Sequence, residues 1–400
     1  MIYLDSHSTA PLDPTVFEKM KPYFLERFGN PSQGLHRFNW EAQAGVSLAR
    51  EQIAKALGAH EKEIVFTGSA TEANHLAILG LAAALASAGK RRVISSGIEH
   101  ASVLGALELL AEKGFTVEWV KLDREGRVDP DDLKARLGPD AGLVSIALAN
   151  HEIGTIQNLR AIADLAHANG ALVHTDAVQA FGKIPFTVDS IGADLVTLSA
   201  HKIHGPKGAG ALYVRRKNPR VELEPVFLGG GQERGLRPGT PNTPAIVGFG
   251  AAAELALSRL AADSNQIRSL RDRLWDRLKK ELPCLIRNTP PEGILPNNLN
   301  VSVEGVDGAA LFGRLKGVAV SNASACLNGT QDYSQVLTVL GVKKELARAT
   351  LRFGLSRFNT QDEIDRTVDE VARVVRELRK MELDFARQTG LEIPTGRCES

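Results

Sequence analysis

The first half of the chain alternates short apolar runs with segments of helical periodicity. Residues 40–57 carry apolar side chains at helical spacing, and Gly58 follows them as a helix stop. The run Ile64–Phe66 ends at Gly68 and leads into an alanine-rich helix. Further strands are expected at 2–5, 92–95, 116–120, 143–148, 171–174, 195–198 and 211–214, and further helices at 102–112 and 159–169. This alternation predicts an α/β fold with a doubly wound, mostly parallel sheet.

After the glycine-rich loop at 229–240 the pattern changes to long amphipathic helices. Two apolar stripes are spaced for helices, Ile267, Leu270, Leu274, Leu278 and Leu282 in one and Ile364, Val368, Val371, Val375 and Leu378 in the other. Thr360 and Glu363 form a capping box before the second stripe. Short strands are expected at 299–303 and 318–320. We therefore predict a large domain at 13–255 and a smaller α+β domain made of 1–12 and 256–400.

Composition narrows the class of protein. The 400 residues are 43% hydrophobic and 24% charged, with a net charge of +1, which gives no electrostatic bias toward nucleic acid or a membrane surface. No apolar run approaches the roughly 20 residues of a membrane span, and the N-terminus lacks the features of a signal peptide. We therefore expect a cytoplasmic enzyme that binds neither nucleic acid nor membrane.

The three cysteines are Cys284, Cys326 and Cys398, and they are far apart in the sequence. They contain no C-x-x-C pair, so they are poor material for a disulfide framework or a structural zinc site. We expect a cysteine to act singly and no metal to be bound. Cys326 stands in the polar segment SNASACLNG, which is typical of an exposed loop, whereas most free cysteines are buried small hydrophobes.

Lys202 is the first candidate for chemistry. It follows the apolar run Leu195–Leu198 and precedes a loop that contains Gly205, Pro206 and Gly208. A lysine at the end of a strand in an α/β sheet lies at the edge where ligands bind, and a desolvated amine has the lowered pKa that suits a Schiff base. Taken alone, the pattern also fits an ordinary solvated lysine.

Other polar clusters follow other predicted strands. They contain Glu99 and His100, then Asn150 to Glu152, then Asp176 and Gln179. The helix expected to begin at Ala70 and Thr71 would offer free backbone N–H groups to a phosphate, although a simply capped helix explains the same residues. A strand-end lysine, an acid 26 residues before it, a helix N-terminus and a histidine together meet the needs of pyridoxal phosphate. The sheet carries no dinucleotide or P-loop motif.

The sequence resembles the cysteine desulfurases of the class V aminotransferase group over nearly its whole length. The resemblance is carried by YLDSHSTAPLDP, GNPSQGLH, VFTGSATEAN, EHASV, NHEIGTIQ, HTDAVQAFGK, SAHKIHGPKGAGALYVRR, GGGQERGLRPGT, SNASAC and LRFGLSRF. It implies the fold type I architecture of pyridoxal phosphate enzymes. The spacing from Cys326 to Arg352 is similar to that of the long-loop subgroup, which contains the housekeeping iron–sulfur enzymes.

The resemblance also implies the cofactor contacts. Lys202 would form the Schiff base, Asp176 would pair with the pyridine nitrogen, His100 would stack on the ring, and Gln179 would bond the phenolic oxygen. The phosphate ligands would be Thr71, Ser199 and His201, joined by Thr240 from the other subunit of a homodimer.

The implied substrate is L-cysteine, which is converted to L-alanine. Arg352 would hold the substrate carboxylate, His100 would assist at the thiol, and Cys326 would take the sulfur as a persulfide. An acceptor protein would then receive this sulfur. Iron–sulfur scaffolds, tRNA thiolation enzymes and DNA sulfur modification all remain open as its destination.

Two positions depart from the family pattern. The second asparagine before EIG is replaced by His151, a candidate substrate contact, and His7 stands where the N-terminal motif has a smaller residue. We expect both changes to affect substrate contacts more than reaction type.

Two alternatives belong to other classes. A related pyridoxal phosphate lyase or aminotransferase, such as a selenocysteine lyase, would use the same site without the thiol, and Cys326 in its polar loop argues against it. A non-catalytic sulfur carrier would not need Lys202 or Asp176.

Overall fold

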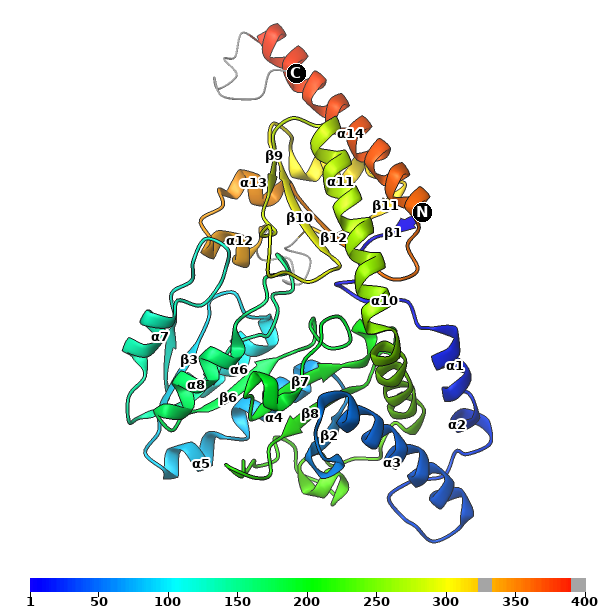
Figure 1. The fold of residues 1–400 in the computed structure, drawn as a ribbon, viewed down its shortest axis with the longest axis vertical. Coiled ribbons are helices and arrows are strands. Elements are labelled where there is room, and N and C mark those ends of the chain that lie inside the picture. The colour runs from blue at the N-terminus through cyan, green and yellow to red at the C-terminus, as the bar shows by residue number, and fades with distance from the viewer. Residues whose placement is uncertain (323–332, 390–400) are drawn as a thin grey trace.

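The computed structural model describes residues 1–322 and 333–389, and its larger body is built on a seven-stranded sheet (Figure 1). The strand order is β2-β8-β7-β6-β5-β3-β4. The strands are β2 (Ile64–Thr67), β3 (Arg92–Ser95), β4 (Thr116–Trp119), β5 (Ala141–Ser145), β6 (Leu172–Asp176), β7 (Leu195–Ser199) and β8 (Gly210–Val214). Only β8 runs antiparallel to its neighbours, so the predicted mostly parallel sheet is confirmed.

The direction of β8 follows from a short connection. Residues 200–209 join β7 to β8, whereas a parallel return would need a crossover of a dozen or more residues. Because β8 is antiparallel to both β7 and β2, those two strands run in the same direction. The carboxyl ends of β2, β7, β6, β5 and β3 therefore meet at one edge of the sheet.

Helices cover both faces of this sheet. The helices of the large body are α1 (Pro14–Met20), α2 (Pro22–Leu25), α3 (Arg37–Leu57), α4 (Ala70–Leu79), α5 (Ala82–Ser87), α6 (Ala101–Glu112), α7 (Pro130–Arg136), α8 (Leu159–Ala168) and α9 (Val188–Ile191). Along β2, Ile64 and Phe66 enter the core shared with α3 and α8, and Val65 enters the core shared with α4 and α6. This alternation of buried side chains is what a doubly wound sheet requires.

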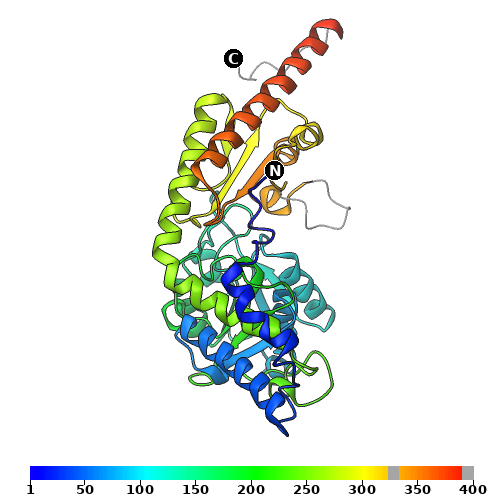
Figure 2. The ribbon, with the colours of Figure 1, turned by 90° about the vertical axis from the view of Figure 1, so that its right-hand side faces the viewer.

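Helix α10 (Thr243–Glu281) passes without interruption through the domain boundary predicted near residue 255 (Figure 2). Its buried side chains up to Ala256 belong to the core of the large body, and those from Ile267 onward belong to the core of the small body. It packs closely on α3, because a Cβ atom on Gly250 would lie 2.5 Å from Ala49 Cα. The division into two domains stays a prediction.

Among the described helices, α10 alone is long and apolar enough to qualify as a membrane span. Its qualifying window is 44% buried inside the protein, and the helix packs against α3. The core helix of a folded protein passes the same length and composition test, and we interpret α10 as such a helix.

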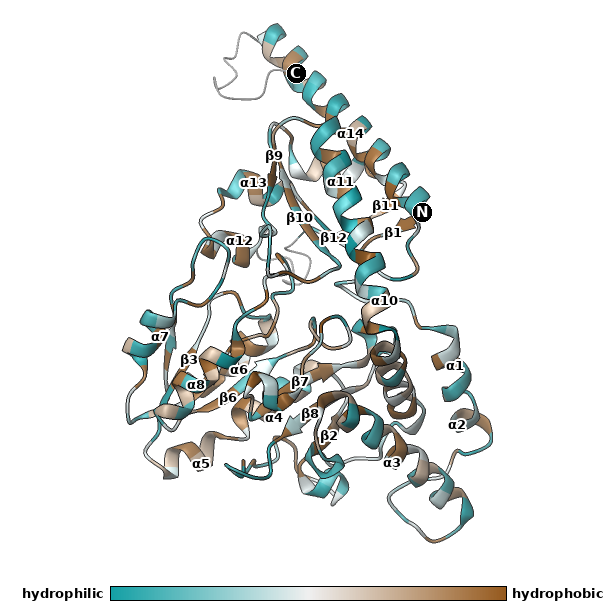
Figure 3. Cartoon of the chain, viewed as in Figure 1, coloured by the Kyte–Doolittle hydropathy of each residue, from teal (hydrophilic) through white to brown (hydrophobic). Residues whose placement is uncertain are grey.

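The smaller body is a three-stranded sheet covered by helices. Its strands are β9 (Leu285–Arg287), β10 (Asn298–Val303) and β12 (Thr350–Gly354), in the antiparallel order β12-β10-β9, beside the short parallel pair β1 (Ile2–Tyr3) and β11 (Val318–Ala319). Its helices are α11 (Gly308–Arg314), α12 (Gln335–Val339), α13 (Lys344–Arg348) and α14 (Gln361–Thr389). Both predicted apolar stripes are buried in its core, and α10 and α14 show brown and teal faces in Figure 3. The capping box of Thr360 and Glu363 is confirmed, with N–H to oxygen distances of 3.2 and 3.1 Å.

Cys284 departs from the expectation that the cysteines act singly. It precedes β9 in the small body, and it is disulfide-bonded in this structure. Cys326 lies outside the described residues. The spacing of the cysteines did not predict the disulfide bond of Cys284, because spacing along the chain does not report proximity in space.

Candidate active site

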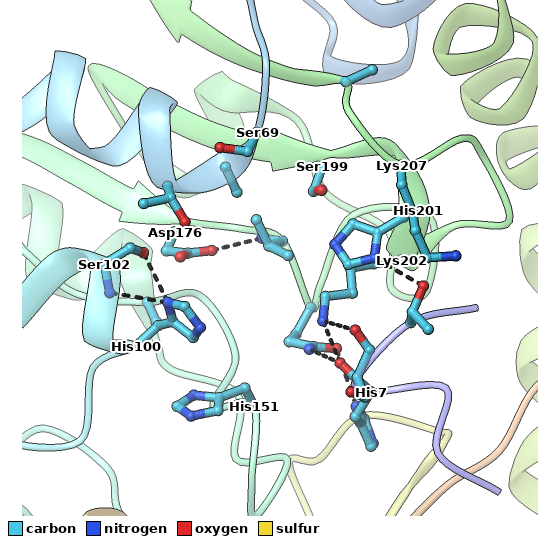
Figure 4. Close-up of a pocket in the computed structure, with 18 of the residues that line it drawn as sticks. His7, Ser69, His100, Ser102, His151, Asp176, Ser199, His201, Lys202 and Lys207 are labelled. Atoms are coloured by element: carbon cyan, nitrogen blue, oxygen red, sulfur yellow. Dashed lines mark hydrogen bonds between the residues drawn. The ribbon is translucent and has the colours of Figure 1, made fainter. Parts of the chain in front are cut away.

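A cavity of about 510 Å³ opens at the carboxyl edge of the large sheet (Figure 4). It collects most of the residues singled out in the sequence, which are Thr71, His100, His151, Asp176, Gln179, Ser199, His201, Lys202 and Arg352. Thr240 lies instead in a second hollow of about 180 Å³, which shares Gly68 and Gly208 with the first. Cys326 lies outside the described residues.

Lys202 enters this cavity from the turn of 3-10 helix that follows β7. Its Nζ donates to the backbone carbonyls of His7 at 2.5 Å and Ser8 at 2.6 Å. The N-terminal segment, which begins in the small body, therefore holds the amine of the large body in place.

Asp176 is the last residue of β6, and its side chain is held from two sides. Asn74 Nδ2 donates to Oδ2 at 2.9 Å, and the backbone N–H of Val178 donates to Oδ1 at 3.0 Å. Asp176 is only 8% exposed and lines the cavity. An ionised carboxylate is an acceptor only, so this position favours a cation or a protonated nitrogen opposite it.

The start of α4 forms the other end of the cavity. Ser69 caps the helix by accepting the N–H of Glu72 at 3.1 Å, while Ala70 and Thr71 line the cavity. Free N–H groups and the positive end of the helix dipole suit an anion there. Lys207, which the sequence reasoning passed over, also lines the cavity, and its place in the glycine-rich loop was the available signal.

Two histidines that line the cavity, His201 and His100, are held in defined protonation states. Burial, reinforced by nearby Lys202 and Lys207, lowers the pKa of His201 to about 4, so its ring is neutral at physiological pH. His100 Nδ1 accepts the backbone N–H of Ser102 at 3.1 Å. Burial also lowers the pKa of His100, so the neutral ring carries its proton on Nε2.

His151 and Arg352 form the wall toward the small body. The ring of His151 lies edge-on to that of His100, with 5.4 Å between ring centroids. Arg352 comes from β12 and donates to the His151 carbonyl at 3.2 Å and to Ser321 Oγ at 2.7 Å. Its Nε is buried and has no hydrogen-bond partner among the described residues, which leaves one guanidinium donor unused.

Two buried carboxyl groups lie behind the cavity. Burial raises the pKa of Glu99 to about 8 and that of Glu152 to about 7. Glu99 accepts the N–H of Ala147 at 3.0 Å and the hydroxyl of Ser96 at 2.6 Å.

In the described part of the chain, no group of three or more His, Cys, Asp and Glu side chains could hold a metal ion.

The sequence of this chain is similar to known proteins. The family model described as aminotransferase class-V matches residues 2–367. A protein named cysteine desulfurase IscS from Anaeromyxobacter sp. (strain K) is 46% identical over 95% of this chain and 94% of its own length. The human cysteine desulfurase is 41% identical over 95% of this chain and 83% of its own length.

This chain belongs to the cysteine desulfurases of the class-V aminotransferase family. Solved structures agree with that placement. The NifS-like protein from Rickettsia africae superposes with a TM-score of 0.84 at 31% identity. The match covers 94% of the chain described here and 99% of the Rickettsia protein. A structure of SspA in complex with cysteine gives a TM-score of 0.78 at 35% identity, and the match covers 90% of this chain and 100% of SspA. The predicted family and fold type are thus confirmed, and the roles of individual residues stay predictions.

Replacing Glu99 with glutamine should change how stability depends on pH. A group whose pKa is raised on folding makes the folded state less stable as pH rises from about 4.5 toward about 8. The free energy of unfolding of the wild type should therefore fall by roughly 1.4 kcal/mol per pH unit across that window, relative to that of Glu99→Gln. Urea unfolding at pH 5.5 and pH 7.5 measures the difference, and parallel pH profiles would contradict the assignment.

Proposed function

We propose that this desulfurase binds pyridoxal 5′-phosphate in the 510 Å³ cavity and uses it to convert L-cysteine to L-alanine. The family uses this cofactor, and the observation that carries the proposal is the convergence of three features on one cavity. They are the amine of Lys202, the carboxylate of Asp176 and the N-terminus of α4. Each complements one part of the cofactor, namely its aldehyde, its pyridine nitrogen and its phosphate.

The remaining cofactor contacts follow from the donors and acceptors present. Ser199 and His201 would join Thr71 at the phosphate, His100 would face the ring, and Gln179 would bond the phenolic oxygen. When bound, the cofactor supplies a Schiff base and an electron sink for the substrate carbon.

The chain's own residues handle the proton and the carboxylate. Arg352 is held by Ser321 and a backbone carbonyl, and it offers a fixed cation to the substrate carboxylate. Lys202 would move the proton on the substrate α-carbon. His100, with its proton on Nε2, would exchange a proton with the substrate thiol.

Sulfur would leave through Cys326. Its thiolate attacks the sulfur of cysteine, the carbon–sulfur bond breaks, and the electron pair stays with the carbon skeleton, which is protonated to L-alanine. Cysteine and the Cys326 thiol are consumed, and alanine and a Cys326 persulfide are formed. We propose an acceptor protein for this sulfur, an iron–sulfur scaffold or a thiolation enzyme, and a cytoplasmic location belongs to the same proposal.

A homodimer is also part of the proposal. Large apolar side chains are exposed on α1 to α3, on the connection between α2 and α3, and on the 226–228 segment, namely Phe17, Phe24, Leu25, Phe28, Leu35, Phe38, Trp40, Leu48, Val226, Phe227 and Leu228. Exposed apolar side chains gathered on a few elements are typical of an association surface. Thr240, which lies outside the cavity of its own chain, would reach the phosphate bound by the partner.

Borohydride reduction should fix the cofactor on Lys202. The purified protein should be yellow, and after reduction the peptide containing Lys202 should carry the cofactor mass, because only a Schiff base is trapped in this way. Lys207 lines the same cavity and Lys183 lies beside Gln179, so both serve as internal controls. Mass spectrometry that finds the label on either of them, or on no lysine, would refute the assignment.

Thr240→Val should weaken cofactor retention without changing the cavity of its own chain. The loss of one hydroxyl bond to a charged phosphate corresponds to about 1.5 to 3 kcal/mol, or roughly 10- to 150-fold in Kd. Thr240→Ser keeps the hydroxyl and is the matched control. Equilibrium dialysis measures the Kd of the cofactor, and sedimentation measures the oligomeric state. A monomer with full cofactor occupancy would contradict a contact of Thr240 with the partner's phosphate.

Cys326→Ser should separate a desulfurase from a thiol-independent lyase. Cofactor binding and the spectral response to L-cysteine should persist, while alanine formation with a reductant present should be abolished. A serine hydroxyl is not ionised near neutral pH, whereas a thiol with a reference pKa of about 8.5 supplies some thiolate. Cys284→Ser is the control and should remain active. Normal cysteine turnover by Cys326→Ser would favour the lyase.

A further inference from the structure

A chain of hydrogen bonds leads from the small body into the cavity, and it begins at Asn298 on β10. Thr289 Oγ1 accepts the N–H of Asn300 at 2.7 Å, so its own proton is donated to Asn298 Oδ1 at 2.8 Å. Asn298 Nδ2 donates to the carbonyl of Glu152 at 2.9 Å. Because a carbonyl oxygen only accepts, these contacts fix the orientation of the Asn298 amide.

The fixed amide determines the tautomer of His7. The second N–H of Asn298 Nδ2 points at His7 Nε2, 3.1 Å away, so that nitrogen must accept. A neutral imidazole then carries its proton on Nδ1, which donates to Gln179 Oε1 at 3.1 Å. His7 is 1% exposed, so neither bond competes with solvent.

The surroundings of His7 keep its ring neutral. Burial lowers the pKa of His7 well below its usual range, and the charges of Lys183, Arg352 and Lys202 act in the same direction. The hydrogen bond that His7 Nδ1 donates to Gln179 raises the pKa, but it does not reverse the shift. A protonated ring would also point an Nε2–H group at the N–H of Asn298.

Gln179 therefore presents a donor to the cavity. Its Oε1 accepts a second bond from Lys183 Nζ at 2.8 Å, and its Nε2 donates to the His7 carbonyl at 3.0 Å. Burial lowers the pKa of Lys183 to about 7, and Nζ donates in either charge state. An amide nitrogen has two N–H groups, so one remains for a ligand in the cavity that Gln179 lines.

We propose that His7, Asn298 and Lys183 are positioning residues that hold Gln179 Nε2 as an N–H donor to the phenolic oxygen of the bound cofactor. The inference rests on the cofactor binding proposed above. A donor at this oxygen stabilises its negative charge, which is most localised when the Schiff base is deprotonated. We call this chain of hydrogen bonds from Asn298, His7 and Lys183 to Gln179 the relay. It thus lowers the pKa of the Schiff base formed at Lys202.

The test is the pH titration of the visible absorption band of the holoenzyme without substrate. His7→Leu should raise the midpoint by about one pH unit, because the orienting bond to Gln179 is lost. No charge is removed, since His7 is neutral, so a shift reports on the amide. His7→Asn retains an N–H donor close to the Nδ1 position and should restore most of the wild-type midpoint.

Two substitutions on β10 give a matched pair. Asn298 and Asn300 both donate to the Glu152 carbonyl, but only Asn298 contacts His7. Asn298→Ala should raise the midpoint by part of the His7→Leu shift, and Asn300→Ala should leave it unchanged. Lys183→Met should also raise it, because a donor to Oε1 and a nearby cation are both lost.

The outcomes separate this inference from the proposed function. If the wild-type protein shows no cofactor band, cofactor binding itself fails. If the wild type is yellow and His7→Leu retains cofactor with an unmoved midpoint, the relay is overturned while the function stands. Equal shifts in Asn298→Ala and Asn300→Ala would also overturn it. Should His7→Leu fail to fold, the β10 pair decides.

Discussion

The site depends on the common direction of five strands in the large sheet. Because β8 returns antiparallel between β2 and β7, the carboxyl ends of β2, β7, β6, β5 and β3 share one edge. Thr71, Lys202, Asp176, His151 and His100 all lie just past, or at, one of those ends. Side chains separated by up to 131 residues along the sequence thereby line one cavity.

Burial then fixes the protonation of the groups that this edge brings together. Histidines 7, 100, 151 and 201 have pKa values lowered chiefly by burial, with nearby cations assisting. Neutral imidazoles donate through one nitrogen and accept through the other, so each ring can be held in one tautomer. The cavity therefore offers defined donors and acceptors at physiological pH.

The small body completes the site from the opposite side. Arg352 comes from β12, Asn298 comes from β10, and the N-terminal segment places carbonyls of His7 and Ser8 on Lys202. The shared helix α10, with side chains in both cores, connects the two bodies covalently and by packing. A change on β10 can therefore reach the cavity through the hydrogen bonds of His7 and Gln179.

Local patterns in the sequence determined the elements and the chemical inventory of this protein. Periodicity predicted α3 up to Gly58, whose φ of 65° shows the left-handed conformation that glycine adopts easily. It also predicted the apolar stripes of α10 and α14, because burial on one face of a helix leaves a repeat in the sequence. Strand-end positions predicted Lys202, Asp176 and His100 as cavity residues, since the edge of a parallel sheet is a property of topology.

Contacts between distant segments were decided only by the tertiary structure. The path of α10 across the predicted boundary, the disulfide of Cys284 and the hollow that holds Thr240 left no local pattern. The hydrogen bonds that link Asn298, His7 and Lys183 to Gln179 were equally hidden, although His7 was visible as a departure from the family motif. A hydrogen bond between segments far apart in the chain depends on the position of both partners, and residue type or spacing along the sequence does not record that position.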